Sequence, residues 1–233
     1  YLGNDPSATT DNAQYNVAIG ATALDAITSG VGNVAVGYDA LKLNNTGFSN
    51  TATGAGALAS NTEGDNNTAL GVETLFTNIS GKDNTASGAA AMLKNTIGSN
   101  NTASGNEALY ENISGSGNTA SGYDALRSNI TGNSNTASGF EALFSNKTGN
   151  NNTAIGYGAD VGANNLTNAT AIGTGAVVNA SSTIQLGNLS VTNVKTSGTI
   201  TVGAITIPKT DGSANQVLKT DGNGTLSWVA ATS

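Results

Sequence analysis

The sequence contains no cysteine and no histidine. Without cysteine there is no disulfide framework and no thiolate site, and without histidine the usual general base and the commonest zinc ligand are missing. Charged residues make up only 10% of the chain and aromatic residues only 5%. The formal net charge of −7 disfavours nucleic acid as a partner, because phosphate binding needs clustered Lys and Arg. No apolar run approaches the ~18 residues of a membrane span, and the residues after Tyr1 do not resemble a signal peptide.

A short phrase, Asn-Thr-Ala-x-Gly-x-x-Ala-Leu, recurs ten times at a constant step of 17 residues. Its copies begin at Asn16, Asn33, Asn50, Asn67, Asn84, Asn101, Asn118, Asn135, Asn152 and Ala169. Low charge combined with abundant Asn, Thr, Ser and Gly is also typical of disordered tracts, but disorder places no demand on which residue recurs every 17. The period therefore predicts one structural unit stacked on itself.

Each repeat is numbered here from position 0 at its first residue. The first five residues alternate with period two, which predicts a strand whose positions 2 and 4 face one way and positions 1 and 3 the other. Positions 2 and 4 are only Ala and Gly, so we expect the opposite wall of the same coil to approach them closely, with Leu at position 8 filling the gap. The predicted coil interior includes Ala18, Gly20, Leu24, Leu41, Leu109 and Leu126. A helical repeat is disfavoured, because each Gly costs a helix about 1 kcal/mol.

The pattern predicts an all-β fold, a parallel β-solenoid of 17-residue rungs spaced about 4.8 Å apart and about 45 Å long. Asn recurs at position 0 and, from Asn44 to Asn146, at position 11. Stacked Asn side chains can form a hydrogen-bonded ladder; alternatively, Asn tolerates left-handed turn geometry. Gly at position 14 indicates a turn that needs either positive φ or tight space.

The other strand face carries apolar residues at both ends of the array and Thr and Ser in the middle. A thin coil cannot bury both faces of one strand, so we expect a second chain to cover this face. The residues predicted to face an oligomer axis include Val17, Ile19, Val34, Val36, Thr102, Ser104, Ile155 and Ile172.

Three phrases, Asn-Val-Ala-Ile-Gly at 16–20, Asn-Val-Ala-Val-Gly at 33–37 and Asn-Thr-Ala-Ile-Gly at 152–156, resemble the head repeats of trimeric autotransporter adhesins of the YadA type. The resemblance implies a left-handed parallel β-roll in a homotrimer, with positions 1 and 3 facing the axis. Those heads repeat at about fourteen residues, whereas the step here is 17 and becomes 14 only from Gly173 to Gly187.

The 17-residue form, as in Ser128 to Gly139, also resembles the repeat shafts of phage-type tail fibres. The segment from Ala214 to Trp228 is similar to the stretch that precedes a self-cleaving chaperone domain in such fibres. The sequence divides into a cap or incoming strand at 1–15, the solenoid at 16–187 and a small β-rich trimeric module at 188–233. In that module we expect turns at Asp211-Gly212 and Asp221-Gly222, and Trp228 inside the trimer.

No catalytic, cofactor-binding or metal-binding constellation is recognisable, so the sequence predicts a non-enzyme without cofactors. The acids at position 6 indicate a solvated edge, with calcium binding as the alternative; they are Asp39, Glu73, Glu107, Asp124 and Glu141. Aromatic residues at positions 5 and 9 either form a sugar- or surface-binding stripe or cover the coil's outer edge. The sequons beginning at Asn44, Asn78, Asn112 and Asn129 follow from the repeat and are interpreted as ladder and turn residues.

These features favour a structural and adhesive shaft of a trimeric extracellular fibre, on a virion or a bacterial surface. Its expected partners are two further copies of the chain and a host-surface glycan or other surface receptor, with no nucleic acid and no membrane span. One alternative is an ice-binding β-solenoid that uses the Thr and Ser ladder in the middle rungs. Another is a polysaccharide depolymerase, which would need paired carboxylates in a groove.

Overall fold

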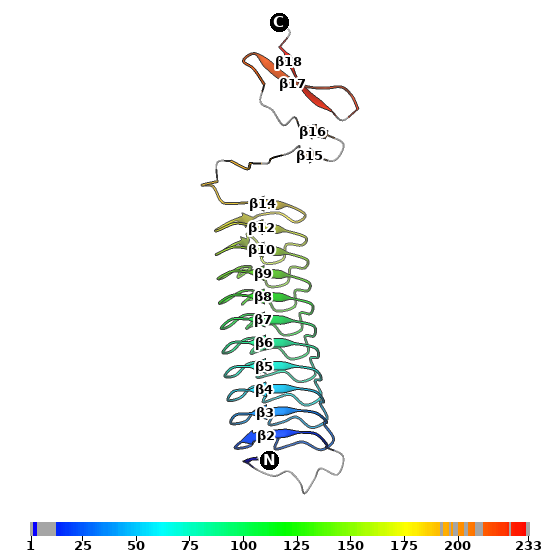
Figure 1. Cartoon of the computed structure of the whole chain (residues 1–233), viewed down its shortest axis with the longest axis vertical. Coiled ribbons are helices and arrows are strands. Elements are labelled where there is room, and N and C mark those ends of the chain that lie inside the picture. The colour runs from blue at the N-terminus through cyan, green and yellow to red at the C-terminus, as the bar shows by residue number, and fades with distance from the viewer. Residues whose placement is uncertain are drawn as a thin grey trace. The chain divides into compact units, whose positions relative to one another are not determined.

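The computed structural model describes residues 2–3, 13–191, 193–195, 197, 200–202, 205–207, 212–223 and 225–231. The chain divides into two compact units, Tyr1–Ser190 and Val191–Ser233. The described residues form strands, turns and bends but no helix. The first unit is a parallel β-solenoid of about ten turns (Figure 1).

One wall of the solenoid is a twelve-stranded parallel sheet in which strands follow one another in chain order, interrupted only by β11 and β13. Its strands are β1 (Leu2–Gly3), β2 (Val17–Gly20), β3 (Val34–Val36), β4 (Thr51–Thr53), β5 (Thr68–Leu70), β6 (Thr85–Ser87), β7 (Thr102–Ser104), β8 (Thr119–Ser121), β9 (Thr136–Ser138), β10 (Thr153–Ile155), β12 (Thr170–Ile172) and β14 (Ile184–Leu186). Identical repeat positions pair directly, as Thr85 with Thr102 and Ala86 with Ala103. The constant 17-residue period of the sequence therefore produces a constant pairing register between neighbouring strands.

The two ends of the sheet depart from the ten predicted copies. At the start, Leu2 pairs with Ile19 and Gly3 with Gly20, so β1 occupies the place of a preceding rung. At the end, β12 pairs with β14 at a step of 14, with Thr170 opposite Ile184.

Backbone hydrogen bonds also join the other walls of successive rungs, although these walls are turns rather than strands. Leu41 N–H donates to the carbonyl of Ala57 at 3.0 Å, and Thr62 N–H donates to that of Ile79 at 3.0 Å. Each rung therefore satisfies backbone polar groups of the next one on several sides, as a thin coil with little apolar bulk requires.

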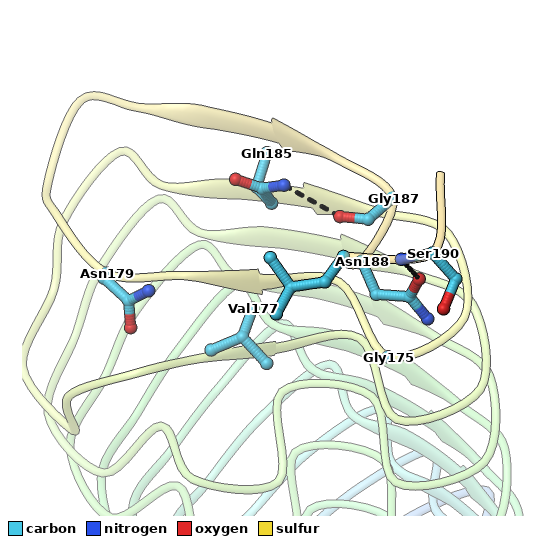
Figure 2. A pocket seen from close by; sticks show the side chains of 8 residues that line it. Gly175, Val177, Asn179, Gln185, Gly187, Asn188 and Ser190 are labelled. Carbon is cyan, nitrogen blue, oxygen red and sulfur yellow. Dashed lines mark hydrogen bonds between the residues drawn. The ribbon is translucent and has the colours of Figure 1, made fainter. Parts of the chain in front are cut away.

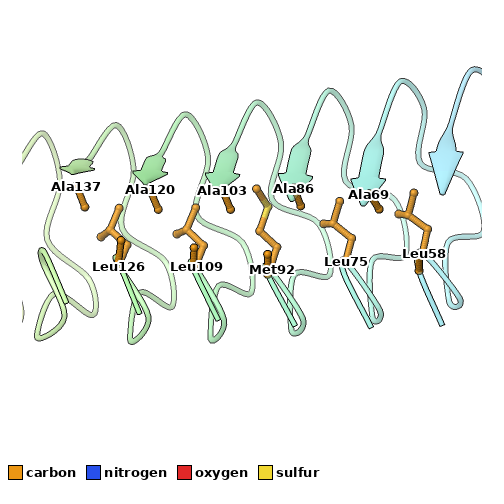
Figure 3. Close-up of a cluster of buried hydrophobic side chains, with 14 of the residues drawn as sticks. Leu58, Ala69, Leu75, Ala86, Met92, Ala103, Leu109, Ala120, Leu126 and Ala137 are labelled. Carbon is orange, nitrogen blue, oxygen red and sulfur yellow. The ribbon is translucent and has the colours of Figure 1, made fainter. Parts of the chain in front are cut away.

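The core consists of small side chains on the sheet and one larger side chain on the opposite wall. Ala at positions 2 and 7 and Leu or Met at position 8 are buried along the coil. Figure 3 shows the strand alanines, such as Ala86 and Ala103, pointing toward the column that holds Leu75, Met92 and Leu109. Of the predicted interior residues, Ala18, Leu24, Leu41, Leu109 and Leu126 all lie in this buried cluster.

The buried leucines have an unexpected backbone conformation. In the first eight rungs the residue at position 8 has a φ between 50° and 55°, for example 55° at Leu109 and 51° at Met92. The left-handed region costs an L-residue roughly 1–2 kcal/mol and disfavours β-branched side chains most strongly, although Thr22 at position 6 does adopt a φ of 57°. Side-chain burial must therefore offset a local backbone cost in every one of these rungs.

In the last two 17-residue rungs a different repeat position fills the interior of the coil. Position 8 is Asp160 in one and Val177 in the other, and both residues begin short paired strands, β11 (Asp160–Val161) and β13 (Val177–Val178). In these rungs the buried residue is at position 9, where Val161 and Val178 are 3% and 1% exposed. The change from a left-handed turn to a strand moves the inward-facing position by one residue.

Glycine at position 4 differs from the expectation of an opposing wall. Gly20 is only half-buried, and a Cβ on it would lie 2.5 Å from the carbonyl oxygen of Gly37 in the next rung. Its φ of 132° is also inaccessible to most side chains. The glycine is required by the stacking of rungs along the solenoid axis, not by the width of the coil.

Two columns of buried Asn amides run through the interior. At position 11, Asn61 Nδ2 donates to Oδ1 of Asn44 at 2.7 Å and to the carbonyl of Gly64 at 2.9 Å. At position 0, Asn50 Nδ2 donates to the same Gly64 carbonyl at 2.7 Å and to Oδ1 of Asn33 at 3.2 Å. The position-14 glycine carbonyl thus joins the two ladders, and a Cβ on Gly64 would lie 2.3 Å from Asn61 Oδ1. Tight space, not positive φ, explains that glycine.

The second unit contains two antiparallel hairpins. Strand β15 (Ile200–Val202) pairs with β16 (Ile205–Ile207), and β17 (Gln216–Thr220) pairs with β18 (Leu226–Ala230). Asp221 closes the second hairpin by accepting the backbone N–H groups of Asn223 at 2.8 Å and Thr225 at 3.0 Å. Trp228 is half-buried, and Asp211 lies outside the described residues.

Candidate interaction surface

The outer face of the twelve-stranded sheet brings together all eight residues predicted to face an oligomer axis. Their side chains form two columns, at positions 1 and 3 of successive strands. Val34 and Val36 are half-buried, and the other six are exposed in the single chain: Val17, Ile19, Thr102, Ser104, Ile155 and Ile172. The face is apolar toward both ends and hydroxylic across β6–β9.

This face carries no charge. Two positions on each of the eleven strands β2–β10, β12 and β14 give 22 side chains, and all are Val, Ile, Leu, Thr or Ser. The strip they form is about 48 Å long, from ten rung steps of about 4.8 Å. The charged residues of the solenoid rungs lie elsewhere, at positions 6, 8, 9, 10, 12, 13, 15 and 16. Charged side chains are ordinarily abundant on solvent-facing surfaces, so their absence distinguishes this wall from the others.

A second wall carries an ion-pair cluster around Tyr110. Lys94 Nζ lies 2.8 Å from both carboxylate oxygens of Glu111, and Arg127 Nε lies 2.8 Å from Glu107 and 3.3 Å from Asp124. Both cations lie over the Tyr110 ring, at 5.2 and 5.0 Å from its centroid. These contacts are partly exposed and connect neighbouring rungs, so they contribute modestly to stability and leave little free charge for a ligand.

The position-6 acids do not form a uniformly solvated edge. Asp124 is only 8% exposed, burial raises the pKa of its carboxyl, and its Oδ1 has no hydrogen-bond partner among the described residues. At Asp39, by contrast, a hydrogen bond from the Thr22 hydroxyl lowers the pKa, and Lys42 pairs with the carboxylate at 3.2 Å. Within the described ranges no group of three or more acidic side chains could hold a metal ion.

Three aromatic residues at position 5 stack on one another near the C-terminal part of the solenoid. The rings of Tyr123 and Phe140 lie 5.2 Å apart at 10°, and those of Phe140 and Tyr157 lie 5.0 Å apart at 8°. Because the ring faces cover one another, mainly ring edges are left for a ligand. This arrangement fits the expectation that these aromatics cover the outer edge of the coil better than it fits a sugar-binding stripe.

The predicted sequon residues are inaccessible. Asn44, Asn78, Asn112 and Asn129 are each 0% exposed, and their amides take part in the position-11 ladder. Attachment of a glycan to these amides would require the rung to open.

A hollow of about 460 Å³ lies at the C-terminal end of the solenoid (Figure 2). Gln185 replaces the interior alanine there, opposite Ala171, and donates its amide to the carbonyl of Gly187 at 2.8 Å. Val177 and Leu189 add apolar surface, and none of the residues lining this hollow is titratable. The hollow lies at the end of the rung stack, and its lining residues include one hydroxyl, on Ser190, but no titratable side chain that could act as its base.

Sequence reasoning missed the left-handed leucines and the burial of Asp124. Position 8 did contain a usable signal, because its first eight residues are Leu or Met and never β-branched. Comparison with known protein families, with curated proteins and with solved structures finds no match. No helix long and apolar enough to cross a bilayer is present in the part of the chain that the structure describes.

Proposed function

We propose that this chain is a non-catalytic, structural and adhesive shaft segment of an extracellular fibre, in which three copies stand side by side. The observation that carries the proposal is the uncharged outer face of the sheet. The three chains would place positions 1 and 3 around a common axis, as the resemblance to the heads of trimeric adhesins implies, each chain forming a left-handed roll.

The apolar ends of this face support self-association. Ile155 is 46% exposed, Ile172 39%, Ile184 67% and Leu186 47% in the single chain. Burial of such area contributes about 25 cal/mol per Å² and is the usual driving force of association. The equal spacing of the rungs would allow a second, parallel copy to align with this face rung for rung.

The size of the strip sets a condition on the assembly. Three residues of strand span about 10 Å, so the strip covers on the order of 500 Å², less than the roughly 800 Å² that each partner contributes to a standard interface. In a trimer each chain contacts two neighbours, and the corners flanking the strip must contribute further area. The second unit, with its two hairpins, is a further source of interchain contact.

The decisive experiment is the mass of the chain in solution. Light scattering of the whole chain is expected to give three times 22.9 kDa, independent of concentration over a wide range. A folded monomer at high concentration would overturn the proposal. The adhesive role is tested separately by adding the assembled protein to bacterial or host cells that display surface glycans and measuring bound protein.

A second candidate function is supported by the hydroxyl columns of β6–β9. Thr and Ser alternate there with buried Ala, and all eight hydroxyl side chains are exposed in the single chain. Neighbouring hydroxyls are expected about 4.8 Å apart along the axis and about 6.7 Å apart within a strand. A monomer would present this regular array to ice. Thermal hysteresis in a concentrated monomeric sample would favour this function, whereas a trimer without hysteresis would exclude it.

A further inference from the structure

A second hollow, of about 140 Å³, lies on the wall formed by positions 5, 6 and 9 of rungs two to four. We name it the Ala55 slot, and its lining residues are Tyr38, Asp39, Ala55, Gly56, Val72, Glu73 and Phe76. We propose that the Ala55 slot binds the guanidinium group of an arginine side chain presented by a partner protein.

The slot exists because the middle of three neighbouring rungs carries a small side chain at position 5. Position 5 of successive rungs is Tyr38, Ala55 and Val72, so the middle rung contributes only a methyl group. Farther along the same column, Phe140 fills the corresponding place and lies 5.2 and 5.0 Å from the rings on either side. The column therefore has room for one flat group beside Tyr38, at the stacking distance that the chain itself uses.

Gly56 adds no side chain to the slot. Gly56 has a φ of 70°, and a Cβ on it would lie 3.2 Å from two ring carbons of Phe76. A side chain at this position would have to displace the Phe76 ring, whereas the left-handed φ alone does not require glycine, because Asp39 and Glu73 adopt it at the same repeat position. Phe76 is half-buried, so the slot has one aromatic wall and an aromatic floor.

The charge at the slot selects a cation. Asp39 and Glu73 line it, and the one cation recorded beside them is Lys42, which pairs with Asp39 at 3.2 Å. The side chain of Glu73 is exposed and makes no hydrogen bond or ion pair among the described residues. The local balance is two carboxylates and one ammonium, a net charge of −1, in a chain whose net charge is −7.

A guanidinium group meets both requirements. It is planar, stacks on aromatic faces and pairs with a carboxylate through two parallel N–H donors. In the slot it would stack on Tyr38 and donate to Glu73, with its aliphatic stem against Val72. An ammonium group would satisfy the charge but not the flat shape, and a neutral sugar ring would satisfy the shape but leave the carboxylate uncompensated.

All seven lining residues belong to one chain, so the slot is complete without trimer formation. Arginine binding deepens the adhesive part of the proposed function by naming the chemistry of a partner. Solution mass tests the trimer and ligand binding tests the slot, so failure of one leaves the other standing.

The experiment uses saturation-transfer NMR on the whole chain with N-acetyl-arginine methylamide as the probe. N-acetyl-citrulline methylamide, which has nearly the same shape without the charge, is the matched comparison. We expect saturation of the arginine side-chain protons, a much weaker signal for citrulline, and loss of the arginine signal at high salt, because the site is exposed and screened. Equal signals for the two probes, or a signal for a methyl pyranoside instead, would overturn the assignment.

Variants locate the binding. Ala55→Phe fills the slot as Phe140 fills its own place, and is expected to abolish the arginine signal while the urea midpoint is unchanged or raised. Ala89→Phe adds the same ring at the exposed alanine two rungs farther along the same column and is expected to leave the signal intact. Glu73→Gln should weaken the signal several-fold without altering stability. Retention of the full signal in Ala55→Phe would place binding elsewhere and refute the proposal.

Discussion

Asn61 and Asn44, one rung apart, are joined by a hydrogen bond of 2.7 Å from Nδ2 to Oδ1, and Asn61 also donates to the carbonyl of Gly64 in its own rung. Both residues are fully buried. Within this column, the Nδ2 group of each Asn donates to Oδ1 of the Asn in the preceding rung, and its own Oδ1 accepts a hydrogen bond from the Asn in the following rung. The column is therefore a continuous polar network inside a core made mostly of alanine, and its members depend on their neighbours.

Breaking this network in the middle is expected to destabilise the solenoid. Asn95→Ala removes a donor to Asn78 Oδ1 and an acceptor for Asn112 Nδ2, both buried. Because each unsatisfied buried polar group costs about 1–3 kcal/mol, the free energy of unfolding should fall by roughly 2–4 kcal/mol. Urea unfolding followed by circular dichroism measures it. Asn100→Gly, at an exposed left-handed position, is the control and should change stability by less than about 0.5 kcal/mol.

The left-handed leucines predict an unusual ranking of core substitutions. Leu109→Met should cost less than about 1.5 kcal/mol, because Met92 already occupies the equivalent place. Leu109→Val should cost at least about 2 kcal/mol more, because it opens a cavity and puts a β-branched side chain at a φ of 55°. The urea midpoints of the two variants decide the matter. Equal stability would show that the backbone conformation at position 8 carries no cost.

Two glycines with positive φ should respond oppositely to substitution. A Cβ on Gly105 would lie 2.4 Å from the carbonyl oxygen of Gly122, whereas the closest atom to a Cβ on Gly117 is Ser134 Oγ at 3.6 Å. Gly105→Ala is therefore expected to prevent correct stacking and lower the melting temperature strongly. Gly117→Asn should fold normally, since Asn occupies the equivalent place at Asn100. A normal melting curve for Gly105→Ala would contradict the stacking explanation.

A charged side chain on the outer face of the sheet should cause the proposed trimer to dissociate into monomers. Ile155→Lys places an ammonium group on that face, and because the side chain is already exposed in the single chain, the rung itself should tolerate it. Light scattering is expected to show 22.9 kDa for this variant at concentrations where the parent chain is trimeric. Ile97→Lys, at a residue that is 56% exposed on a different wall, is the matched control and should leave the mass unchanged.

Asp160 should make the solenoid less stable as pH rises through the acidic range. Burial raises the pKa of its carboxyl above 3.8, and hydrogen bonds from Ser145 and Val161 offset only part of this effect. Between 3.8 and the raised value the folded state binds more protons than the unfolded state, so the free energy of unfolding falls with increasing pH.

Asp160→Asn removes this titration. Relative to the parent chain, the variant should therefore gain stability as the pH rises from 3.8 through the raised pKa of Asp160, in urea titrations at several pH values. A difference between the two chains that does not change with pH would show that the carboxyl titrates normally.

Much of the fold follows from the sequence because its elements repeat. The alternation of Thr-Ala-x-Gly gives the strand, and the recurrence of Asn at positions 0 and 11 gives the ladders. The left-handed backbone conformation of Leu24 or Leu109 could not be predicted so directly, because leucine has no intrinsic preference for positive φ. Only the change at Val177, where the backbone becomes a strand, shows why β-branched residues are absent from the earlier rungs.

Some features of the candidate surface could likewise be predicted from the sequence, and others could not. The two faces of each strand follow from period two, which places Val17 and Thr102 in one column. The Ala55 slot could not be predicted, because it arises from three rungs at once: Ala55 matters only since Tyr38 and Val72 flank it and Phe76 lies over Gly56. The burial of Asp124 likewise depends on neighbours in other rungs, not on its own position in the repeat.

Because the amide ladders keep a constant register, whole 17-residue rungs can be deleted from the solenoid or duplicated within it. Removal of Asn84 to Asn100 would join Asp83 to Asn101 and bring Asn67 beneath Asn101, restoring the position-0 amide ladder with one rung fewer. Each such excision shortens the rod by about 4.8 Å, and each duplication lengthens it by the same amount. Gene duplication in units of 51 nucleotides could thus change the length of the solenoid in small steps while keeping the amide ladders in register.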